Sequence, residues 1–271
     1  MGSGIAEVAA ASGYDVVLRS RSQASADAMK AGVEKSLARQ VEREKRTADD
    51  AAAILARVSV TTDLKDLAPC DLVIESVVED LAVKIALFKE LDAIVSESTI
   101  VATNTSTLPV VEMAMATSRP QNVCGIHFFN PAPAMALVEV VRPITASDET
   151  FDAAMAFATS CGKEAVAVKD QAGFIVNALL FPYLNNAIRL LENGVATREG
   201  IDTAMKGGCG FPMGPFALLD LVGLDTSLAI LDALYQEFAD PNYAAVPLLR
   251  RMVAAGQLGR KTKSGFYDYN K

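Results

Sequence analysis

The sequence is poor in the side chains that build metal sites and disulfide frameworks. It has one histidine and four cysteines, and no two of the cysteines form a C-x-x-C pair: Cys70, Cys124, Cys161 and Cys209. Thiols this far apart indicate neither a metal site nor a disulfide framework. They favour a reducing compartment, and we therefore expect a cytoplasmic protein without a bound metal.

Long apolar runs and an excess of positive charge are also missing. Stretches such as LVIESVV are too short to span a bilayer, and no basic and then apolar signal opens the sequence. The formal net charge is -8 at pH 7, whereas nucleic acids and anionic membranes attract clustered Lys and Arg. We therefore expect neither nucleic acid nor membrane as a partner, and an anionic ligand would need a local basic site.

Short apolar strands alternate with helical stretches over about the first 170 residues. Strands are expected in YDVVLRS, RVSVTT, CDLVIESV, STIVATN and NVCGIHFF. This alternation predicts a parallel sheet covered by helices on both faces. The Ala-rich segment from about Ala24 to Arg57 has a helical period on both sides of a polar bend, which predicts an inserted helical hairpin.

The pattern changes near Asp170, after which only helical periodicity is present. A long helix is expected in GFIVNALLFPYLNNAIRLLENG, with Gly194 at its end, and another in GPFALLDLVGLDTSLAILDALYQEF, with Pro215 in its first turn. The 271 residues are enough for one large or two modest domains. We therefore predict a second, all-helical domain over residues 171–271.

The chain opens with MGSGIAEVAAASGYDVVLRSRS, a glycine pair followed by a helix and a strand. In the dinucleotide fingerprint G-x-G-x-x-G, glycines between a strand and a helix allow a tight turn and close approach of a pyrophosphate. A glycine pair alone is a weak signal, but the strand that follows strengthens it. The predicted fold is α/β, with a Rossmann-type, doubly wound sheet in residues 1–170 that binds NAD(P).

The end of this strand lacks the carboxylate that usually binds the adenosine ribose hydroxyls of NAD. It carries Arg19, Ser20, Arg21 and Ser22 instead. Two guanidinium groups beside a hydroxyl suit a 2′-phosphate, so the sequence favours NADP over NAD. The alternative is that both arginines are solvated loop charges.

His127, the only histidine, lies in VCGIHFFNPAPAMALVEVVRP. A lone histidine beside aromatic residues is by default a satisfied core residue. Here, however, a Pro-rich turn separates two apolar strands, and Glu139 is an isolated charge in the second. Paired strands would bring this carboxylate to His127. Such a partner holds an imidazole in one tautomer, as a general base requires.

Six motifs in order resemble the 3-hydroxyacyl-CoA dehydrogenase family, particularly its single-function bacterial 3-hydroxybutyryl-CoA dehydrogenases. They are VIESVVEDLAVK, NTSTLP, GIHFFNPAPAMALVEVV, GFIVNALLFPYLNNAIRLLENG, GFPMGPFALLDLVGLD and GRKTKSGFYDY. The resemblance implies hydride transfer between NAD(P) and short-chain (S)-3-hydroxyacyl-CoA or 3-oxoacyl-CoA. It also implies a homodimer in which the helical domain serves dimerisation and substrate binding.

The resemblance assigns roles to the residues of these motifs. His127 matches the acid/base and Glu139 the residue that orients it. Ser106 and Asn177 match positions that hydrogen-bond the reacting oxygen and the substrate, and Asn130 matches another polar position of the active site. The structural alternatives are a helix N-cap for Ser106 and a first-turn residue for Asn177.

Further matches concern the cofactor and coenzyme A. Gly2 corresponds to the third fingerprint glycine, and Glu79, Lys84, Ser106 and Lys261 match cofactor contacts. Ser36 and Arg43, on the helical hairpin, align with residues that contact coenzyme A. Solvated surface charge is the alternative for Glu79, Lys84 and Arg43. Ser20 stands where many family members have Asp.

The family pattern begins with an apolar strand leading into G-x-G-x-M-G-x-G-I-A, and Met1 falls on its internal Met. The resemblance thus implies a strand and two glycines before Met1. Because that strand is central in the family's sheet, we expect a chain that truly starts at Met1 to be poorly stable and to bind cofactor weakly.

Two other functions stay open at this point. A sugar-acid dehydrogenase of the gulonate type shares the predicted fold, and it would oxidise a free hydroxy acid but reject CoA thioesters. A non-catalytic binding or structural protein would follow if the first strand were truly missing.

Overall fold

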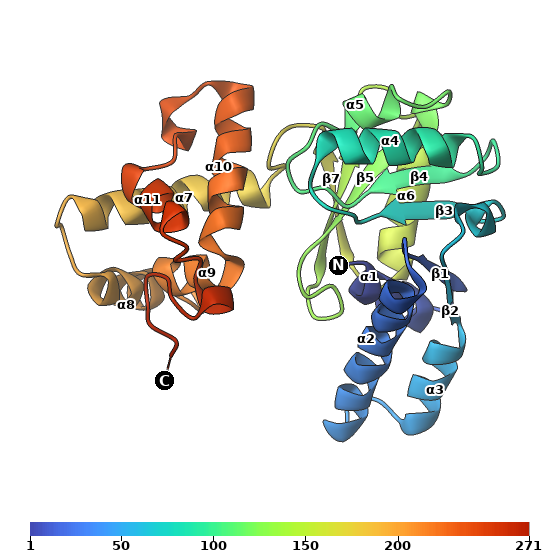
Figure 1. The fold of residues 1–271 in the computed structure, drawn as a ribbon, viewed down its shortest axis with the longest axis horizontal. Helices are drawn as coiled ribbons and strands as arrows, with labels where there is room; N and C mark the ends of the chain where they lie inside the picture. The colour runs from blue at the N-terminus through green and yellow to red at the C-terminus, as the bar shows by residue number, and fades with distance from the viewer. Residues whose placement is uncertain (271) are drawn as a thin grey trace. The chain divides into compact units, whose positions relative to one another are not determined.

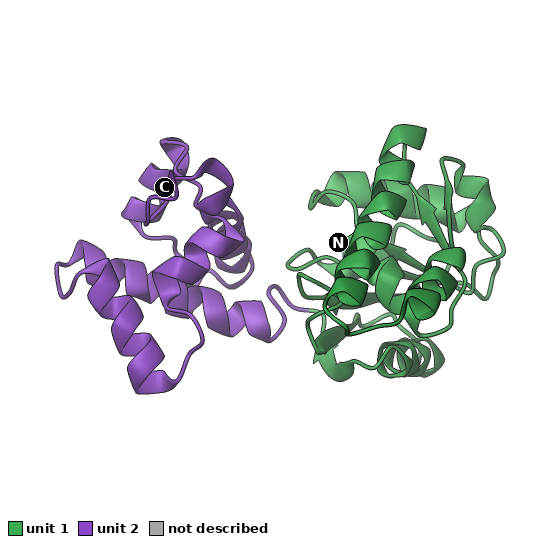
Figure 2. Cartoon of the chain, turned by 90° about the horizontal axis from the view of Figure 1, so that it is seen from below, with its two compact units in different colours: residues 1–170 green, residues 171–271 purple. Residues whose placement is uncertain are grey.

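The computed structural model describes residues 1–270, which form two compact units (Figure 2). Unit 1 comprises residues 1–170 and unit 2 residues 171–271. Among the described residues, all the strands belong to unit 1, and unit 2 is built from helices (Figure 1).

Unit 1 alternates helices and strands as expected. Its elements are α1 (Gly2–Ala11), β1 (Val16–Arg19), α2 (Gln23–Glu42), α3 (Ala48–Ala56), β2 (Val58–Thr61), η1 (Leu64–Leu67), β3 (Leu72–Glu75), α4 (Leu81–Asp92), β4 (Ile100–Thr103), α5 (Val110–Ala114), η2 (Pro120–Asn122), β5 (Val123–Phe128), β6 (Leu137–Arg142), α6 (Asp148–Ser160) and β7 (Glu164–Lys169). Four of these helices, α2, α3, α4 and α6, have a side-chain N-cap. The capping residues, each of which accepts a hydrogen bond from a first-turn amide, are Ser22, Thr47, Asp80 and Ser147.

The strands form two sheets within the described residues. β1 and β2 make a parallel pair, and β3, β4, β5, β6 and β7 follow one another in a five-stranded sheet. The Rossmann-type arrangement is present, but its doubly wound sheet is in two pieces. The parallel sheet predicted from the earlier segments is present from β3 to β5, whereas β6 runs antiparallel to β5. Only residues 129–136 separate these strands, and a parallel crossover needs a dozen or more.

Helices cover both faces of the five-stranded sheet (Figure 1). α1 and α6 bury apolar side chains on one face, where Ile5 and Ala154 join the core with Cys124 and Ile126 of β5. On the other face, a Cβ added to Gly125 would lie 3.4 Å from Val110 of α5. Since successive strand residues point to opposite faces, His127 shares the α5 face with Gly125.

The predicted helical hairpin is present as α2 and α3, which a polar bend separates. Val33 and Leu37 of α2 and Ile54 of α3 pack with Ala6 and Ala10 of α1 in a second, smaller core. The hairpin is therefore fastened to the first helix of unit 1 and to the β1–β2 pair.

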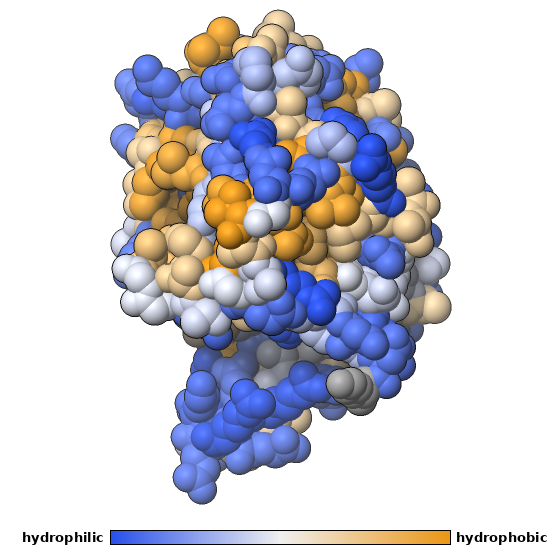
Figure 3. Space-filling model, turned by 90° about the vertical axis from the view of Figure 1, so that its left-hand side faces the viewer, coloured by the Kyte–Doolittle hydropathy of each residue, from blue (hydrophilic) through white to orange (hydrophobic). Residues whose placement is uncertain are grey.

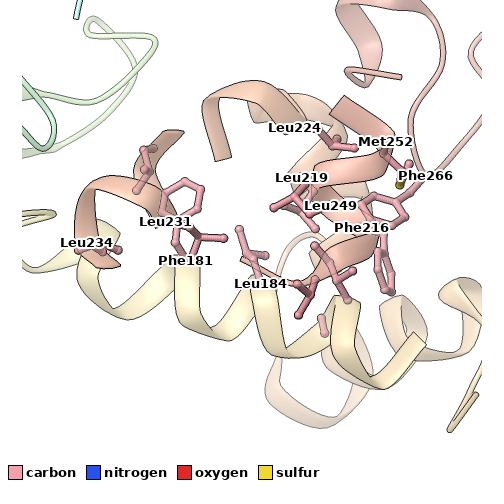
Figure 4. Packing of buried hydrophobic residues seen from close by; sticks show 14 of the residues in the cluster. Phe181, Leu184, Phe216, Leu219, Leu224, Leu231, Leu234, Leu249, Met252 and Phe266 are labelled. Carbon is pink, nitrogen blue, oxygen red and sulfur yellow. The ribbon is translucent and has the colours of Figure 1, made fainter. Parts of the chain in front are cut away.

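Unit 2 consists of α7 (Val176–Glu192), α8 (Arg198–Cys209), α9 (Pro215–Val222), α10 (Leu224–Phe238), η3 (Pro241–Tyr243), α11 (Pro247–Ala254) and η4 (Arg260–Thr262). Figure 4 shows its core, in which Phe181 and Leu184 of α7 face Leu231 and Leu219 of the following helices. The helix expected after Pro215 is split at Gly223, whose φ of 103° favours glycine.

Within residues 1–270, no helix has both the length and the apolar character needed to cross a membrane.

Candidate active site

His127 and Glu139 form a buried pair between β5 and β6. The two residues lie directly opposite each other in the antiparallel ladder, and His127 Nδ1 is 2.7 Å from Glu139 Oε2. Relative exposure is 4% for His127 and 0% for Glu139. Because a carboxylate only accepts hydrogen bonds, Nδ1 carries the proton and the second ring nitrogen, Nε2, is left for other chemistry.

Ser106 lies on the other side of the imidazole. Its Oγ is 3.2 Å from His127 Nε2, so Glu139, His127 and Ser106 form a continuous hydrogen-bonded chain. The N-cap alternative for Ser106 is wrong, because α5 begins only at Val110 and Pro109 precedes it. The lone histidine is thus held by partners at both nitrogens, in the arrangement of a general acid/base.

Asn104 follows β4, and Asn130 follows β5, the strand that carries His127. Asn104 Oδ1 accepts the Phe128 amide at 2.7 Å and ties the loop after β4 to the end of β5. Asn130 is exposed and begins the turn between β5 and β6. Lys163 Nζ holds that turn by donating to the carbonyls of Ala132 and Met135, each at 2.8 Å.

A second polar cluster lies at the carboxyl ends of β3 and β4. Lys84 Nζ is 2.7 Å from Glu75 Oε1 and 3.3 Å from Glu79 Oε2. The solvated alternative is therefore wrong for Lys84, which is only 1% exposed. Glu79 is more open, and its Oε1 accepts the Thr105 hydroxyl and, at 2.8 Å, the Ser106 amide.

Sequence reasoning missed three residues of this second cluster: Glu75, Thr103 and Thr105. The signal for Glu75 was present, because it is a charge within the apolar segment DLVIESVV, as Glu139 is within ALVEVV. It missed Asp170 as well, whose carboxylate accepts the amides of Val110 and Val111 at 3.0 and 2.7 Å. Burial raises the pKa of Asp170, although both amides favour its ionised form.

Gly2 lies at the start of α1. The arginine-rich segment, residues 19–22, lies at the end of β1. A Cβ on Gly2 would come within 3.0 Å of Ser76 Oγ, so the amino end of α1 approaches the loop after β3. Arg19 Nε donates to the Thr62 carbonyl at 3.3 Å. Ser20 is partly buried and Arg21 is exposed.

The residues predicted to contact coenzyme A lie on or directly after α2. Ser36 is partly buried, and Arg43 is the exposed residue that ends the helix. Their role stays a prediction.

Asn177 and Lys261 belong to unit 2. Asn177 lies in the first turn of α7, as its structural alternative stated, and is 8% exposed. Lys261 Nζ lies 2.5 Å from an oxygen of Asp225. Their expected roles beside substrate and cofactor therefore stay predictions.

Comparisons with known proteins agree along the whole chain. Residues 1–171 match the model of the 3-hydroxyacyl-CoA dehydrogenase NAD binding domain, and residues 173–269 match that of the C-terminal domain of the same family. The 3-hydroxybutyryl-CoA dehydrogenase of Clostridioides difficile is 49% identical, over 100% of this chain and 96% of the relative. Human mitochondrial hydroxyacyl-coenzyme A dehydrogenase is 46% identical, over 99% of this chain and 88% of the relative.

A solved structure extends the likeness to three dimensions. The crystal structure of (S)-3-hydroxybutyryl-CoA dehydrogenase from Ralstonia eutropha superposes with a TM-score of 0.97 at 45% identity, covering 100% of this chain and 96% of the other. The resemblance seen in the six motifs is confirmed, and this chain belongs to the 3-hydroxyacyl-CoA dehydrogenase family.

Proposed function

We propose that this protein is an NAD(P)-dependent 3-hydroxybutyryl-CoA dehydrogenase. It interconverts short-chain (S)-3-hydroxyacyl-CoA and 3-oxoacyl-CoA. The observation that carries the proposal is the buried chain from Glu139 through His127 to Ser106, in a member of a family whose relatives have the same named activity. An imidazole oriented by a carboxylate is suited to exchange a proton with a hydroxyl group.

The amino end of α1 fits the pyrophosphate of a dinucleotide. α1 begins Gly2-Ser3-Gly4, and neither an acidic residue in its first turn nor a side-chain cap is found there. A Cβ on Gly4 would come within 3.3 Å of Ala132 and Pro133, so a larger residue would be crowded at the start of this helix. A helix amino end with small residues favours phosphate groups. When bound, the oxidised cofactor would accept the hydride from C3 of the substrate.

The protein's own residues handle the proton. In the oxidation, His127 Nε2 takes the proton of the 3-hydroxyl group while the C3 hydrogen leaves as hydride. Glu139 stabilises the imidazolium that forms, because it lies against Nδ1. With substrate bound, the Ser106 hydroxyl turns from Nε2 and donates its hydrogen bond to the reacting oxygen, and Asn130 and Asn177 are proposed to complete the polar surroundings of this oxygen. In the reduction, His127 returns the proton to the oxygen.

We further propose that NADP is preferred over NAD. The preference is supported by the exposed or partly exposed Arg19, Ser20 and Arg21 at the end of β1, where an NAD-specific site would carry a carboxylate. The nearby Ser22 hydroxyl accepts the Ser25 amide and begins α2, so a phosphate in this place would also face a helix amino end.

Steady-state reduction of acetoacetyl-CoA by NADPH and by NADH tests both proposals. We expect turnover with both cofactors and a higher kcat/KM for NADPH. Ser20→Asp should move the preference toward NADH, since a carboxylate repels the 2′-phosphate and binds the ribose hydroxyls. Unchanged selectivity would contradict the role of the arginine-rich segment but not the enzyme activity.

The remaining binding residues are proposals from the family match. Glu79, Lys84 and Lys261 would contact the cofactor, and Ser36 and Arg43 would contact the phosphates of coenzyme A. A free hydroxy acid such as L-gulonate should therefore be a poor substrate. Turnover of gulonate with rejection of acetoacetyl-CoA would favour a sugar-acid dehydrogenase instead.

We also propose a cytoplasmic location, which is supported by the cysteines. Within the described residues all four are free thiols: Cys70, Cys124, Cys161 and Cys209. Fractionation of the native cells, with activity measured in each fraction, tests it.

A further inference from the structure

Glu75 and Lys84 form a buried ion pair beneath the loop that carries Ser106. Glu75 ends β3, and its side chain is 0% exposed. Lys84 Nζ lies 2.7 and 2.9 Å from the two carboxylate oxygens of Glu75. The Val77 amide donates to the same carboxylate at 2.5 Å. Neither charge could stay buried without its partner at an acceptable free energy.

One route from this pair to Ser106 passes through Lys84. The ammonium group that Glu75 neutralises also lies 3.3 Å from Glu79 Oε2. The other oxygen of Glu79 accepts the Ser106 amide. Glu79 is 40% exposed at its side chain, so the buried cation restrains a carboxylate that water would otherwise leave free to rotate.

A second route passes through Thr103, the last residue of β4. Its hydroxyl donates to Glu75 Oε2 at 2.8 Å and accepts the Thr105 amide at 3.1 Å. Glu75 therefore restrains both the residue before Ser106 and, through Lys84 and Glu79, the Ser106 amide itself. Both routes end at backbone amides of the loop that carries Ser106, and the Ser106 hydroxyl lies 3.2 Å from His127 Nε2.

We propose that Glu75 is a positioning residue, whose buried carboxylate fixes the Ser106 hydroxyl on His127 through Lys84 and Thr103. Within the described contacts, Glu75 touches neither Ser106 nor His127. It acts on the loop after β4, which carries Ser106. The kinetic consequences of this proposal rest on the proposed dehydrogenase function. The effect on His127 does not, because it is a property of the folded protein alone.

Stability alone is a poor explanation for this ion pair. A buried pair often stabilises a fold no more than apolar residues of the same volume would. Unit 1 also holds an ion pair between Asp92 and Arg119, 3.0 Å apart. It lies near the amino ends of β4 and β5, beside Thr99 and Val123. That pair is more exposed, with side chains 15% and 17% accessible, and it serves as a control because it links elements of the same unit away from the proposed site.

Four variants test the proposal: Glu75→Gln, Thr103→Val, Thr103→Ser and Asp92→Asn. We expect Glu75→Gln and Thr103→Val to lower kcat for acetoacetyl-CoA by about 10- to 100-fold, since small displacements of positioned groups cost this much. The KM for acetoacetyl-CoA should change by less than about threefold, because the residues that bind this substrate are not removed. Thr103→Ser keeps the hydroxyl and should retain kcat, and Asp92→Asn should lower the melting temperature but not kcat.

A spectroscopic readout is independent of turnover. His127 is the only histidine, so its two imidazole nitrogens give single signals in a nitrogen-15 NMR spectrum of the labelled protein. The Nε2 signal should shift in Thr103→Val and Glu75→Gln and return to its wild-type position in Thr103→Ser. It should not move in Asp92→Asn.

The outcomes separate the two proposals. An inactive wild type with the predicted Nε2 shifts would contradict the dehydrogenase function but support the positioning role. The positioning role would be overturned if Glu75→Gln and Thr103→Val kept the wild-type kcat and their Nε2 signals did not shift. It would also be overturned by an Asp92→Asn variant that loses as much kcat as they do. If Glu75→Gln does not fold, the Thr103→Val and Thr103→Ser pair decides by itself.

Discussion

At the scale of single residues, burial determines which thiols are chemically available. Cys124 lies in the middle of β5 with 0% exposure, and burial raises its pKa to about 12. Burial also raises the pKa of Cys70 and Cys161. Since the thiolate is the reactive form, we expect Cys124 to be inert toward alkylating reagents in the folded protein.

Because burial raises the pKa of Cys124, the unfolding free energy of unit 1 should decrease as the pH rises above 9. The pKa of this thiol is higher in the folded than in the unfolded chain, so its contribution is fully present below the ordinary value of 9.0 and is lost as the pH rises toward 12. Between pH 8 and pH 10, the difference in unfolding free energy between wild type and Cys124→Ala should shrink by about 1 kcal/mol. Urea unfolding at both pH values measures it, and a constant difference would contradict the burial argument.

The sequence predicted the pair of His127 and Glu139 but not that of Glu75 and Lys84, and the reason is geometric. Strands joined by a short turn pair in antiparallel register, so the partner of His127 follows from the sequence pattern. Glu75 instead ends a parallel strand, and its partners lie in a helix nine residues later and in a neighbouring strand. Which side chains meet at such a strand end depends on loop paths that no local pattern specifies.

At the scale of elements, a buried carboxylate fastens the final segment of the chain to α9. Asp220 is 1% exposed and accepts the amides of Phe266 and Tyr267 at 2.9 and 2.8 Å. Gly265 is required there, because a Cβ would lie 2.0 Å from Asp220 Oδ1. Nearby, burial and the hydrogen bond to Asp202 raise the pKa of Tyr267.

Asp220→Ala should lower the unfolding free energy of unit 2 by about 3 kcal/mol, because two amides in this buried region lose their acceptor. The matched control is Asp232→Ala. Asp232 pairs with Arg250 at an exposed position, where removal of a salt bridge costs about 0 to 1 kcal/mol. Equal effects in chemical denaturation would show that the final segment is not held by Asp220.

Elements were predicted well where periodicity and end signals agree, as in α1, α2 and α3. The break at Gly223 was missed because apolar residues continue across it in LVGLD. β7 was missed as well, since its sequence, EAVAVK, is short and mostly exposed. An edge strand of this kind takes its conformation from pairing with β6 rather than from its own pattern.

At the scale of the whole molecule, each unit has its own apolar core. Apolar side chains also gather on the face of unit 2 that Figure 3 presents. Several large apolar residues of this unit are exposed, among them Leu179 at 71% and Val195 at 66%. Exposed apolar surface of this kind is typical of an interface with another chain.

We therefore predict a homodimer. Size-exclusion chromatography with light scattering should give twice the 28.7 kDa of one chain, independent of dilution in the micromolar range, as homodimer interfaces are commonly apolar. A mass of one chain at all concentrations would contradict the prediction and leave the exposed apolar residues without this explanation.

The central claim is that His127, oriented by Glu139, exchanges the proton that accompanies hydride transfer. The most direct test compares wild type and His127→Gln in the reduction of acetoacetyl-CoA, with cofactor binding measured separately by nucleotide fluorescence. The account predicts that kcat falls by about 10² to 10⁴, the usual contribution of general acid/base catalysis, while cofactor affinity is retained. A variant with near wild-type turnover would contradict it.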